Sequence, residues 1–268
     1  QGRPGWHIEC SVMSRKYLGE EIDIHAGGED LIFPHHENEI AQSESANGKI
    51  FARYWMHNGF LNIDNKKMSK SLGNFFTVRD IAQKYDLQVL RFFMLSAHYR
   101  SPLNFSAELM EAAENGLERI LTCVDNLKFL LTNSKEEVLR PEEETLLQEA
   151  DSFRVKFEEA MDDDINTADA IAAVFELVKF ANTKADGECS KALLEGLLQK
   201  ICLMTDILGL IVEKKEEILD EEIEEMIEAR QAARKEKNFA KADEIRAQLL
   251  EKGILLEDTR EGVKWKRV

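Results

Sequence analysis

The chain has 268 residues, of which 44% are hydrophobic, and its 35 Lys+Arg and 51 Asp+Glu give a formal net charge of −16. This hydrophobic content excludes wholesale disorder, and no run approaches the ~18 apolar residues that a membrane span requires. The acidity argues against a protein that binds nucleic acid through bulk charge alone.

The excess negative charge lies in the middle of the chain. Residues 1–140 carry 16 bases and 19 acids, residues 141–228 carry 8 and 25, and residues 229–268 carry 11 and 7. This distribution indicates three segments, of which the last is mildly basic. The four cysteines show no paired spacing, which is typical of a reducing compartment, and we expect a cytoplasmic protein.

Residues 1–104 are predicted to form mixed α/β structure. Short strand-like runs at residues 22–25 and 59–63 alternate with helical stretches, and Gly, Pro and Asn residues lie between them. Such alternation is typical of an α/β domain.

Two helices are expected near the end of this first segment. Thr77 suits the N-cap of a helix over residues 77–85, and Asp80 stands three residues later, as in a capping box. Residues 86–98 are mostly apolar and predict a largely buried helix.

Residues 105–212 have helical periodicity almost throughout. Apolar residues recur every three or four positions in four stretches, at residues 109–131, 146–161, 168–180 and 193–210. Four such stretches joined by short polar loops predict an antiparallel helix bundle. The consecutive acids at 162–164 point in different directions on a helix, so we expect a loop and a helix cap there, not a metal site.

Residues 223–268 are predicted to form a small, basic α+β tail domain. Two helices are expected over residues 223–237 and 239–252, followed by two short strands around a turn. Gly253 suits the position directly after the second helix, where a left-handed backbone is common.

A possible metal site lies near the start of the chain. His35 and Glu39 are four residues apart on a predicted helix and therefore lie on one face of it. With a thiolate from Cys10 they make a chemically reasonable zinc-binding set, and His36 is a candidate to support the ligands. From the residues alone the alternative remains open that Cys10 is structural and that the polar residues only begin a helix.

The second motif is KMSKS at residues 67–71, followed by Leu-Gly-Asn. Its two lysines, Lys67 and Lys70, and its two hydroxyls lie on a loop that ends in glycine, and such a loop can bind a polyphosphate. The G-x-x-x-x-G-K-[ST] pattern of a P-loop is absent. For an arbitrary pentapeptide of this composition, an exposed loop would be the ordinary interpretation.

The KMSKS sequence matches in full the signature of class I aminoacyl-tRNA synthetases. Further stretches resemble the cysteinyl-tRNA synthetase family specifically: RPGWHIECS at 3–11, DIHAGG at 23–28, FPHHENE at 33–39, YWMH at 54–57, DDDINT at 162–167 and GVKW at 262–265. Because these motifs are spread from one end of the chain to the other, the resemblance covers all of it.

The resemblance implies a fold in three parts. These are the C-terminal half of a Rossmann-like catalytic domain over residues 1–104, an anticodon-binding type of helix bundle over 105–222 and a small tail domain over 223–268. It also implies ATP-dependent ligation of L-cysteine to its tRNA through a cysteinyl-adenylate, with magnesium accompanying ATP. Zinc would select the cysteine thiolate. A cytoplasmic monomer that does not bind membranes is expected.

The resemblance also assigns roles to residues of the first segment. Cys10, His35 and Glu39 fall at zinc-ligand positions of the family, and Trp6 and His25 fall at positions of the amino-acid pocket near the metal. For Trp6 the alternative is a packing aromatic. For His25 the alternative is a histidine at a strand end that is hydrogen-bonded to a loop.

The resemblance places Lys70 at the ATP-contacting position and makes Lys67 and Lys70 the catalytic cations of the loop. Contacts to the anticodon end of tRNA are expected from basic and aromatic residues of the tail, because cations bind phosphates and an aromatic ring can stack on an unpaired base. The candidates are Arg230, Arg234, Lys235, Lys237 and Trp265. For any single lysine, a solvated helical face is the alternative.

The sequence departs from the family in one respect. The family's catalytic domain begins with a segment that carries H-x-G-H and supplies a cysteine as a fourth zinc ligand, and neither occurs here. We therefore expect a C-terminal portion of the enzyme that is inactive alone. Two alternatives remain open: a tRNA-binding fragment or paralogue without complete catalysis, and a mycothiol-type cysteine ligase. The basic residues 229–268 favour the tRNA enzyme over the latter.

Overall fold

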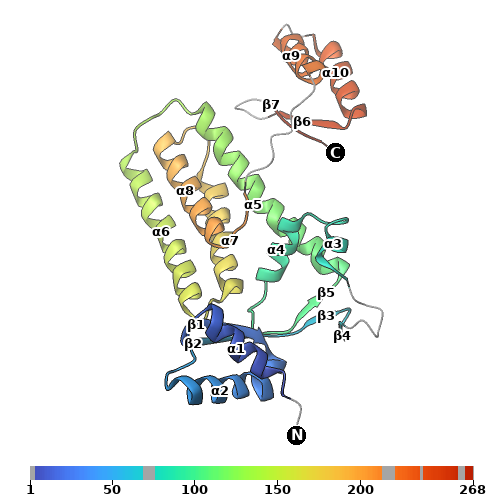
Figure 1. Ribbon diagram of the computed structural model, residues 1–268. Coiled ribbons are helices and arrows are strands. Elements are labelled where there is room, and N and C mark those ends of the chain that lie inside the picture. The colour runs from blue at the N-terminus through green and yellow to red at the C-terminus, as the bar shows by residue number, and fades with distance from the viewer. Residues whose placement is uncertain (1–3, 69–75, 213–220, 236–237, 259–262, 268) are drawn as a thin grey trace.

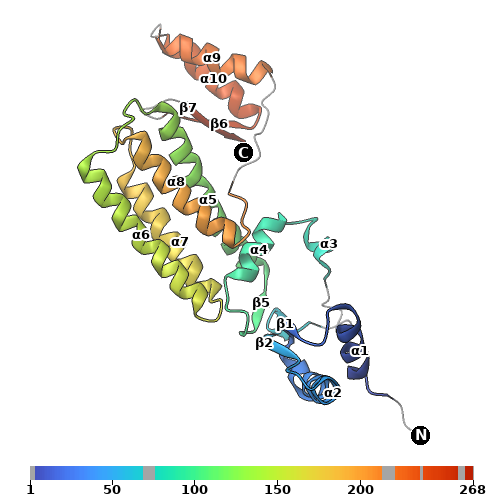
Figure 2. The ribbon, with the colours of Figure 1, turned by 60° about the vertical axis from the view of Figure 1, so that its left-hand side comes forward.

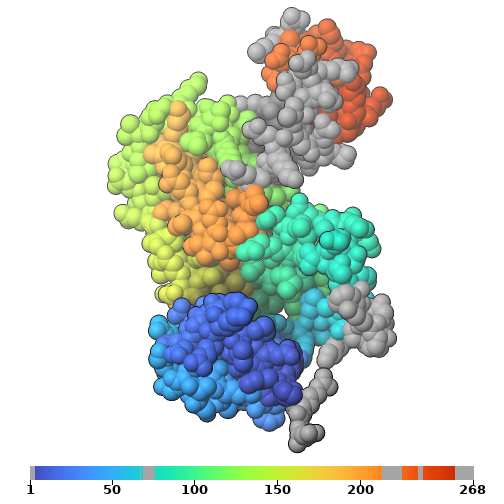
Figure 3. Space-filling model, in the orientation of Figure 1, coloured from blue at the N-terminus to red at the C-terminus, as the bar shows by residue number. Residues whose placement is uncertain are grey.

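The computed structural model describes residues 4–68, 76–212, 221–235, 238–258 and 263–267. Three groups of elements follow one another along the chain: an N-terminal α/β group, a bundle of long helices and a small C-terminal group (Figures 1 and 2). In the space-filling view the N-terminal group lies against one end of the bundle (Figure 3). This layout confirms the predicted fold class. Among the described residues, no helix combines the length and the apolar character needed to cross a membrane.

The N-terminal group contains two small sheets. In the first, β1 (Ile22–Gly28) and β2 (Ala52–Asn58) are parallel, and Gly27 lies opposite His57. In the second, β3 pairs with β4 in antiparallel and with β5 in parallel orientation. The other elements of this group are α1 (His7–Tyr17), η1 (Glu29–Leu31), η2 (Ile32–His36), α2 (Glu37–Asn47), β3 (Leu61–Ile63), β4 (Lys66–Lys67), α3 (Val78–Ile81), α4 (Leu87–Leu95) and β5 (Leu103–Phe105).

Several predicted elements of this group differ in extent. The strand predicted at residues 22–25 continues to Gly28, and β2 was not predicted, because its sequence ARYWMHN has no regular apolar–polar alternation. The helix predicted over 77–85 is shorter, although Thr77 and Asp80 do form the predicted capping box. The predicted domain boundary after residue 104 falls inside β5, which pairs with β3.

The bundle consists of four helices that coincide with the four predicted stretches. They are α5 (Ala107–Asn133), α6 (Pro141–Asp162), α7 (Thr167–Lys184) and α8 (Lys191–Ile207). Their apolar faces form one core, in which Phe157, Leu177 and Leu197 are at most 1% exposed. Gly196 allows α8 to approach α6 closely, since a Cβ there would lie 2.7 Å from a methyl group of Leu147. The predicted bundle is therefore confirmed.

Glu143 joins the start of α6 to the start of α8. Its buried carboxylate, 1% exposed, accepts hydrogen bonds from the Arg140 guanidinium at 2.7 Å and from the backbone N–H groups of Arg140 and Ser190, both at 2.9 Å. Burial alone would raise the pKa of Glu143, but these hydrogen bonds outweigh it and lower the pKa to about 2. The carboxylate thus stabilises two helix N-termini while ionised.

Replacing Glu143 by Gln is expected to lower the free energy of unfolding by about 2–3 kcal/mol at neutral pH, because charged hydrogen bonds to buried donors are lost. The folded-state pKa lies below the ordinary value of 4.5, so this contribution is present above pH 4.5 and is lost as the pH falls towards 2. Denaturant titrations across this range should show the difference from the wild type shrinking. The exposed neighbour serves as the control: Glu144→Gln should change little at any pH.

The C-terminal group has its own small core. It contains α9 (Glu221–Lys235), α10 (Phe239–Glu251) and the antiparallel strands β6 (Ile254–Asp258) and β7 (Val263–Arg267). Ile245, Leu249, Ile254 and Leu256 form a cluster separate from the core of the bundle. Gly253, at φ 76°, follows α10 as predicted, so the expected order of two helices and two strands is confirmed.

Candidate functional site

A cluster of potential metal ligands lies where α1, η2 and α2 meet. Cys10 lies on α1, His35 on η2 and Glu39 in the first turn of α2. One ligand atom from each of these residues lies within 4.8 Å of the other two. His35 and Glu39 are 6% and 1% exposed, whereas Cys10 is half-buried. The structure therefore brings together the three residues that the sequence predicted as zinc ligands.

The position of Glu39 suits a ligand of a cation. Its Oε1 lies 2.8 Å from His35 Nε2, yet this buried oxygen has no partner with hydrogen-bond geometry. Two ligand-type atoms that approach closely without bonding to each other can both be directed at a common ion. The other oxygen, Oε2, is 2.9 Å from His25 Nε2, so His25 orients the carboxylate from the neighbouring strand β1.

The chemistry of the set suits zinc. Ligand atoms at the corners of a tetrahedral zinc site lie about 3.3–3.8 Å apart. The three ligand atoms here lie within 4.8 Å of one another, and His35 Nε2 and Glu39 Oε1, at 2.8 Å, would move apart by about 0.5 Å to share an ion. Burial, together with the negative charges of Glu39 and Glu9, raises the pKa of the Cys10 thiol. Since a thiol binds metal as thiolate, a bound cation would be needed to lower this pKa. The residues present therefore fit a zinc ion.

Further histidines extend the cluster towards β2. His36 Nδ1 lies 2.8 Å from His57 Nε2, and the His36 ring lies 4.7 Å from that of His25. Burial, with the nearby His25, His57 and His35, lowers the pKa of His36 to about 4. His36 is therefore neutral near pH 7. His25, His36 and Glu39 form a second group of possible ligands, but this group lacks the thiolate that favours zinc over other metals.

The structure also places His57 within this cluster, although the sequence assigns it no role in the site. No pattern in the sequence reveals this, because the contact depends on the parallel pairing of β1 with β2, which sets Gly27 opposite His57. The pKa of His57 is lowered by burial, by the positive charge of Arg100 and by His25. The candidate supporting residue His36 is buried at 3% exposure, as that role would require.

The two predicted pocket residues contact different members of the ligand set. The ring of Trp6 lies 4.1 Å from that of His35, and Trp6 is 62% exposed. His25 touches Glu39 and packs edge-on against Trp55. His25 is thus bonded to a helix residue rather than to a loop. Contact of Trp6 or His25 with an amino acid stays a prediction.

Of the two predicted nucleotide-binding lysines, the structure describes only the backbone of Lys67. Lys67 ends β4, and its side chain is not described, while Lys70 lies outside the described residues.

In the tail, Arg234 is exposed on α9, whereas Arg230 is buried at 3% exposure. A tRNA contact by Arg230 would require its guanidinium to leave this buried position, so of these two we retain Arg234.

The other tail candidates are placed by their backbone only. Lys235 ends α9, and Trp265 lies opposite Leu256 in the β6–β7 pair; neither side chain is described. Lys237 lies outside the described residues. Their proposed contacts with tRNA stay predictions.

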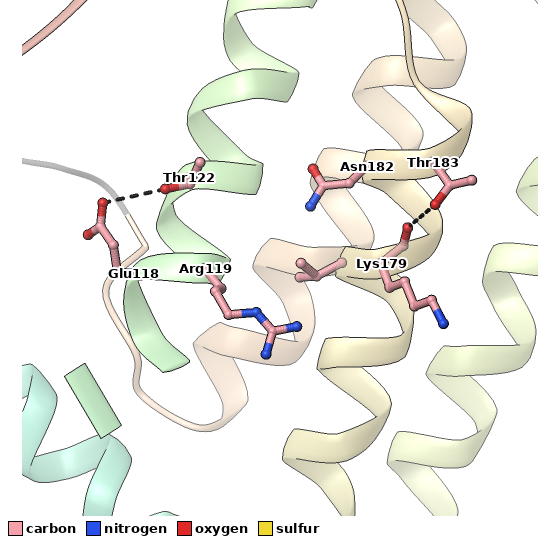
Figure 4. Close-up of a pocket in the computed structure, with 7 residues that line it drawn as sticks. Glu118, Arg119, Thr122, Lys179, Asn182 and Thr183 are labelled. Carbon is pink, nitrogen blue, oxygen red and sulfur yellow. Dashed lines mark hydrogen bonds between the residues drawn. The ribbon is translucent and has the colours of Figure 1, made fainter. Parts of the chain in front are cut away.

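A shallow hollow of ≈ 350 Å³ lies between α5 and α7 on the bundle (Figure 4). Its polar lining comes from Glu118, Arg119 and Thr122 on α5 and from Lys179, Asn182 and Thr183 on α7. The Arg119 guanidinium lies over the Phe175 ring at 4.8 Å. The lining contains neither histidine nor cysteine. The metal-ligand cluster of the N-terminal group is therefore the better candidate for chemistry.

Three known families match successive parts of the chain. Residues 1–115 match the family described as tRNA synthetases class I (C) catalytic domain. Residues 156–213 match the DALR domain, and residues 217–265 match the cysteinyl-tRNA ligase anticodon binding domain.

Curated proteins named cysteine–tRNA ligase are similar to nearly the whole chain. The chain is 68% identical to one from Lachnospira eligens, over 99% of this chain and 56% of that protein. It is 57% identical to one from Clostridioides difficile, over 100% of this chain and 58% of that protein. The chain thus spans just over half the length of these relatives.

A solved structure supports the fold. The ternary complex of Agrobacterium radiobacter K84 agnB2 LeuRS-tRNA-LeuAMS is similar with a TM-score of 0.59 at 21% identity, over 71% of this chain and 26% of that chain. At this level of identity the likeness concerns the fold alone.

Proposed function

Because the chain belongs to the cysteinyl-tRNA synthetase family, we propose that it works within an enzyme that uses ATP to join L-cysteine to its tRNA. The observation that carries this proposal is the convergence of Cys10, His35 and Glu39 in a chain whose relatives are cysteine–tRNA ligases. The proposed steps are formation of cysteinyl-adenylate and transfer of cysteine to the terminal ribose of the tRNA.

Cys10, His35 and Glu39 would hold zinc, with His25 fixing the carboxylate of Glu39 through its 2.9 Å contact. Zinc, when bound, would supply a soft Lewis acid that prefers a thiolate to a hydroxyl, and cysteine differs from serine in this group alone. A site that recognises its substrate through a specific bond can reject an analogue by about 10⁴–10⁵ without editing. The half-buried Cys10 and the exposed Trp6 leave this side of the cluster open to an amino acid.

Lys70, with Lys67, would bind the phosphates of ATP, which arrives with magnesium. Attack of the cysteine carboxylate on the α-phosphate builds negative charge on the phosphate oxygens, and positioned cations stabilise that charge. Lys67 ends β4, and Lys70 follows three residues later in the sequence. Their closeness to β4 along the chain supports this role, since β4 belongs to the same N-terminal group as the ligand cluster.

The tail is proposed to bind the anticodon end of the tRNA, with Arg234, Lys235, Lys237 and Trp265 as contacts. The match of residues 217–265 to an anticodon binding domain supports this role and favours the tRNA enzyme over a mycothiol-type ligase. A monomeric state and a cytoplasmic location remain part of the proposal.

The test is a chimaera of this chain with the remaining part of the Lachnospira eligens relative. We expect it to exchange pyrophosphate into ATP in the presence of L-cysteine and to charge tRNA with cysteine. Exchange without charging would indicate a ligase with another acceptor, such as an amino-sugar. Tight tRNA binding without exchange would indicate a binding protein. Either outcome would overturn the proposal.

A further inference from the structure

In the turn between α6 and α7, the carboxylate of Asp164 accepts hydrogen bonds from the N-terminal group. The Tyr99 hydroxyl donates to Asp164 Oδ1 at 2.7 Å. Arg100 donates through Nε to Oδ2 at 2.5 Å and through Nη2 to Oδ1 at 3.1 Å. We call Tyr99, Arg100 and Asp164 the clasp. Figures 1 and 3 show this end of the bundle facing the N-terminal group.

On the N-terminal side of the clasp, the backbone of Tyr99 is held by a hydrogen bond and by close packing. The carbonyl oxygen of Tyr99 accepts a hydrogen bond from the backbone N–H of Gly59 at 2.8 Å. A Cβ on Gly59 would lie 2.5 Å from the backbone of Ser101, so only glycine allows this close approach. Gly59 follows β2 two residues after His57, which lies 2.8 Å from His36 in the ligand cluster. The clasp is therefore connected to the ligand cluster through Gly59, His57 and His36.

The backbone is strained on the bundle side of the clasp. Asp164 and Ile165 both have φ near 56°, in the left-handed region. A β-branched residue is rarely found there, and such strain persists only where the surroundings impose it. The Ile165 side chain is 42% exposed, so burial of that side chain does not account for its conformation. The conformation does direct the Asp164 carboxylate at Tyr99 and Arg100.

We propose that Asp164 is a positioning residue that fixes the orientation of the helix bundle relative to the metal-ligand cluster. The paired hydrogen bonds from the planar guanidinium of Arg100 fix direction as well as distance, which a single point charge does not. Because Arg100 and Asp164 are 52% and 43% exposed, the clasp adds little to stability. The clasp instead affects the orientation of the bundle relative to the ligand cluster. If the proposed function holds, it aligns a bound tRNA with the site of charging.

The Asp164 carboxylate stays ionised over the whole neutral range. The hydrogen bonds from Arg100 and Tyr99 lower its pKa to about 2, against burial that would raise it, and the nearby His98, 3.8 Å away, acts in the same direction as Arg100. The bundle and the N-terminal group have further connections that do not involve the clasp. Arg91 Nε donates to the Leu208 carbonyl at 2.7 Å, the backbone N–H of Ile211 donates to Gln88 at 2.9 Å, and the α4 residues Val89, Phe92 and Phe93 are buried in the core of the bundle. Loss of the clasp should therefore loosen the orientation without separating the two groups.

Distance measurements on this chain test the proposal directly. Nitroxide labels carried by unnatural amino acids at the exposed positions Glu37 on α2 and Glu149 on α6 report the orientation of the two groups. We expect a narrow distance distribution in the parent, a broader one in Asp164→Ala, and the parent distribution in the control Asp162→Ala. Arg100→Lys should broaden it as well, because the paired geometry is lost. An unchanged distribution in Asp164→Ala would overturn the proposal.

Two activities of the chimaera distinguish a positioning role of Asp164 from a general loss of structure. Asp164→Ala should slow tRNA charging about tenfold while leaving cysteine-dependent pyrophosphate exchange unchanged, since only charging requires the aligned tRNA. Equal charging by variant and parent would overturn the positioning role. If the parent chimaera shows no exchange, the proposed function fails, and the distance distributions alone decide the clasp. Should Asp164→Ala fail to fold, Asp164→Asn keeps the shape and removes the charge that binds Arg100.

Discussion

Replacing Cys10 by serine is expected to weaken zinc binding about 100-fold or more. The hydroxyl is a far poorer zinc ligand than a thiolate, and even the loss of a residue that merely supports a ligand costs 10–100-fold. His35→Ala should have a similar effect, because it removes the imidazole that lies 2.8 Å from Glu39. Metal content after exhaustive dialysis against a weak chelator measures both variants.

Another cysteine of the chain supplies the control for the zinc measurement. Cys202 lies on α8 in the bundle, is half-buried like Cys10, and should retain the parent's zinc content when changed to serine. Full zinc occupancy in both Cys10→Ser and His35→Ala would show that these residues are not the ligands. The second group of possible ligands, which contains His36, would then be assigned as the zinc site.

Replacing Lys70 by alanine in the chimaera is expected to slow cysteine-dependent pyrophosphate exchange by about 10²–10³-fold. An electrostatic group directed at charge that develops in the transition state contributes an effect of this size. Zinc content should not change, because the ligands lie on α1, η2 and α2. Pyrophosphate exchange at saturating cysteine and ATP measures the rate.

Lys66 offers a matched control for the lysine experiment. It is an exposed lysine on β4, directly before the KMSKS sequence, so Lys66→Ala removes the same charge from a neighbouring position. We expect little change in its exchange rate. If Lys70→Ala and Lys66→Ala exchange equally fast, the role of Lys70 in ATP binding is wrong.

The helical part of the fold was predictable because its signals are local. The spacing of apolar residues in the bundle predicted α5 to α8, and a single Thr–Asp pair predicted the cap of α3. The length of α3 was not predictable, since tertiary contacts decide how far a weak helix continues. The strand β2 was missed because its sequence ARYWMHN shows no regular alternation of apolar and polar residues.

The ligand cluster was predictable only in part. His35 and Glu39 share one helical face, and this follows from their spacing. Cys10, far away in the sequence, joined them as a candidate because a thiolate suits zinc, and the resemblance to a family supported it; no periodicity reveals this grouping. The contact between His36 and His57, and the clasp at Asp164, depend on strand register and on the packing of two distant segments. Neither leaves a signal in a single sequence.

The central claim is that zinc held by Cys10, His35 and Glu39 selects the thiol of cysteine. Zinc X-ray absorption of this chain tests it most directly, because it counts the sulfur neighbours of the metal. We expect the sulfur of Cys10 alone in the absence of amino acid, one further sulfur when L-cysteine is added, and no change with L-serine. An unchanged count with saturating L-cysteine, while nitrogen from His35 remains bound, would contradict the claim.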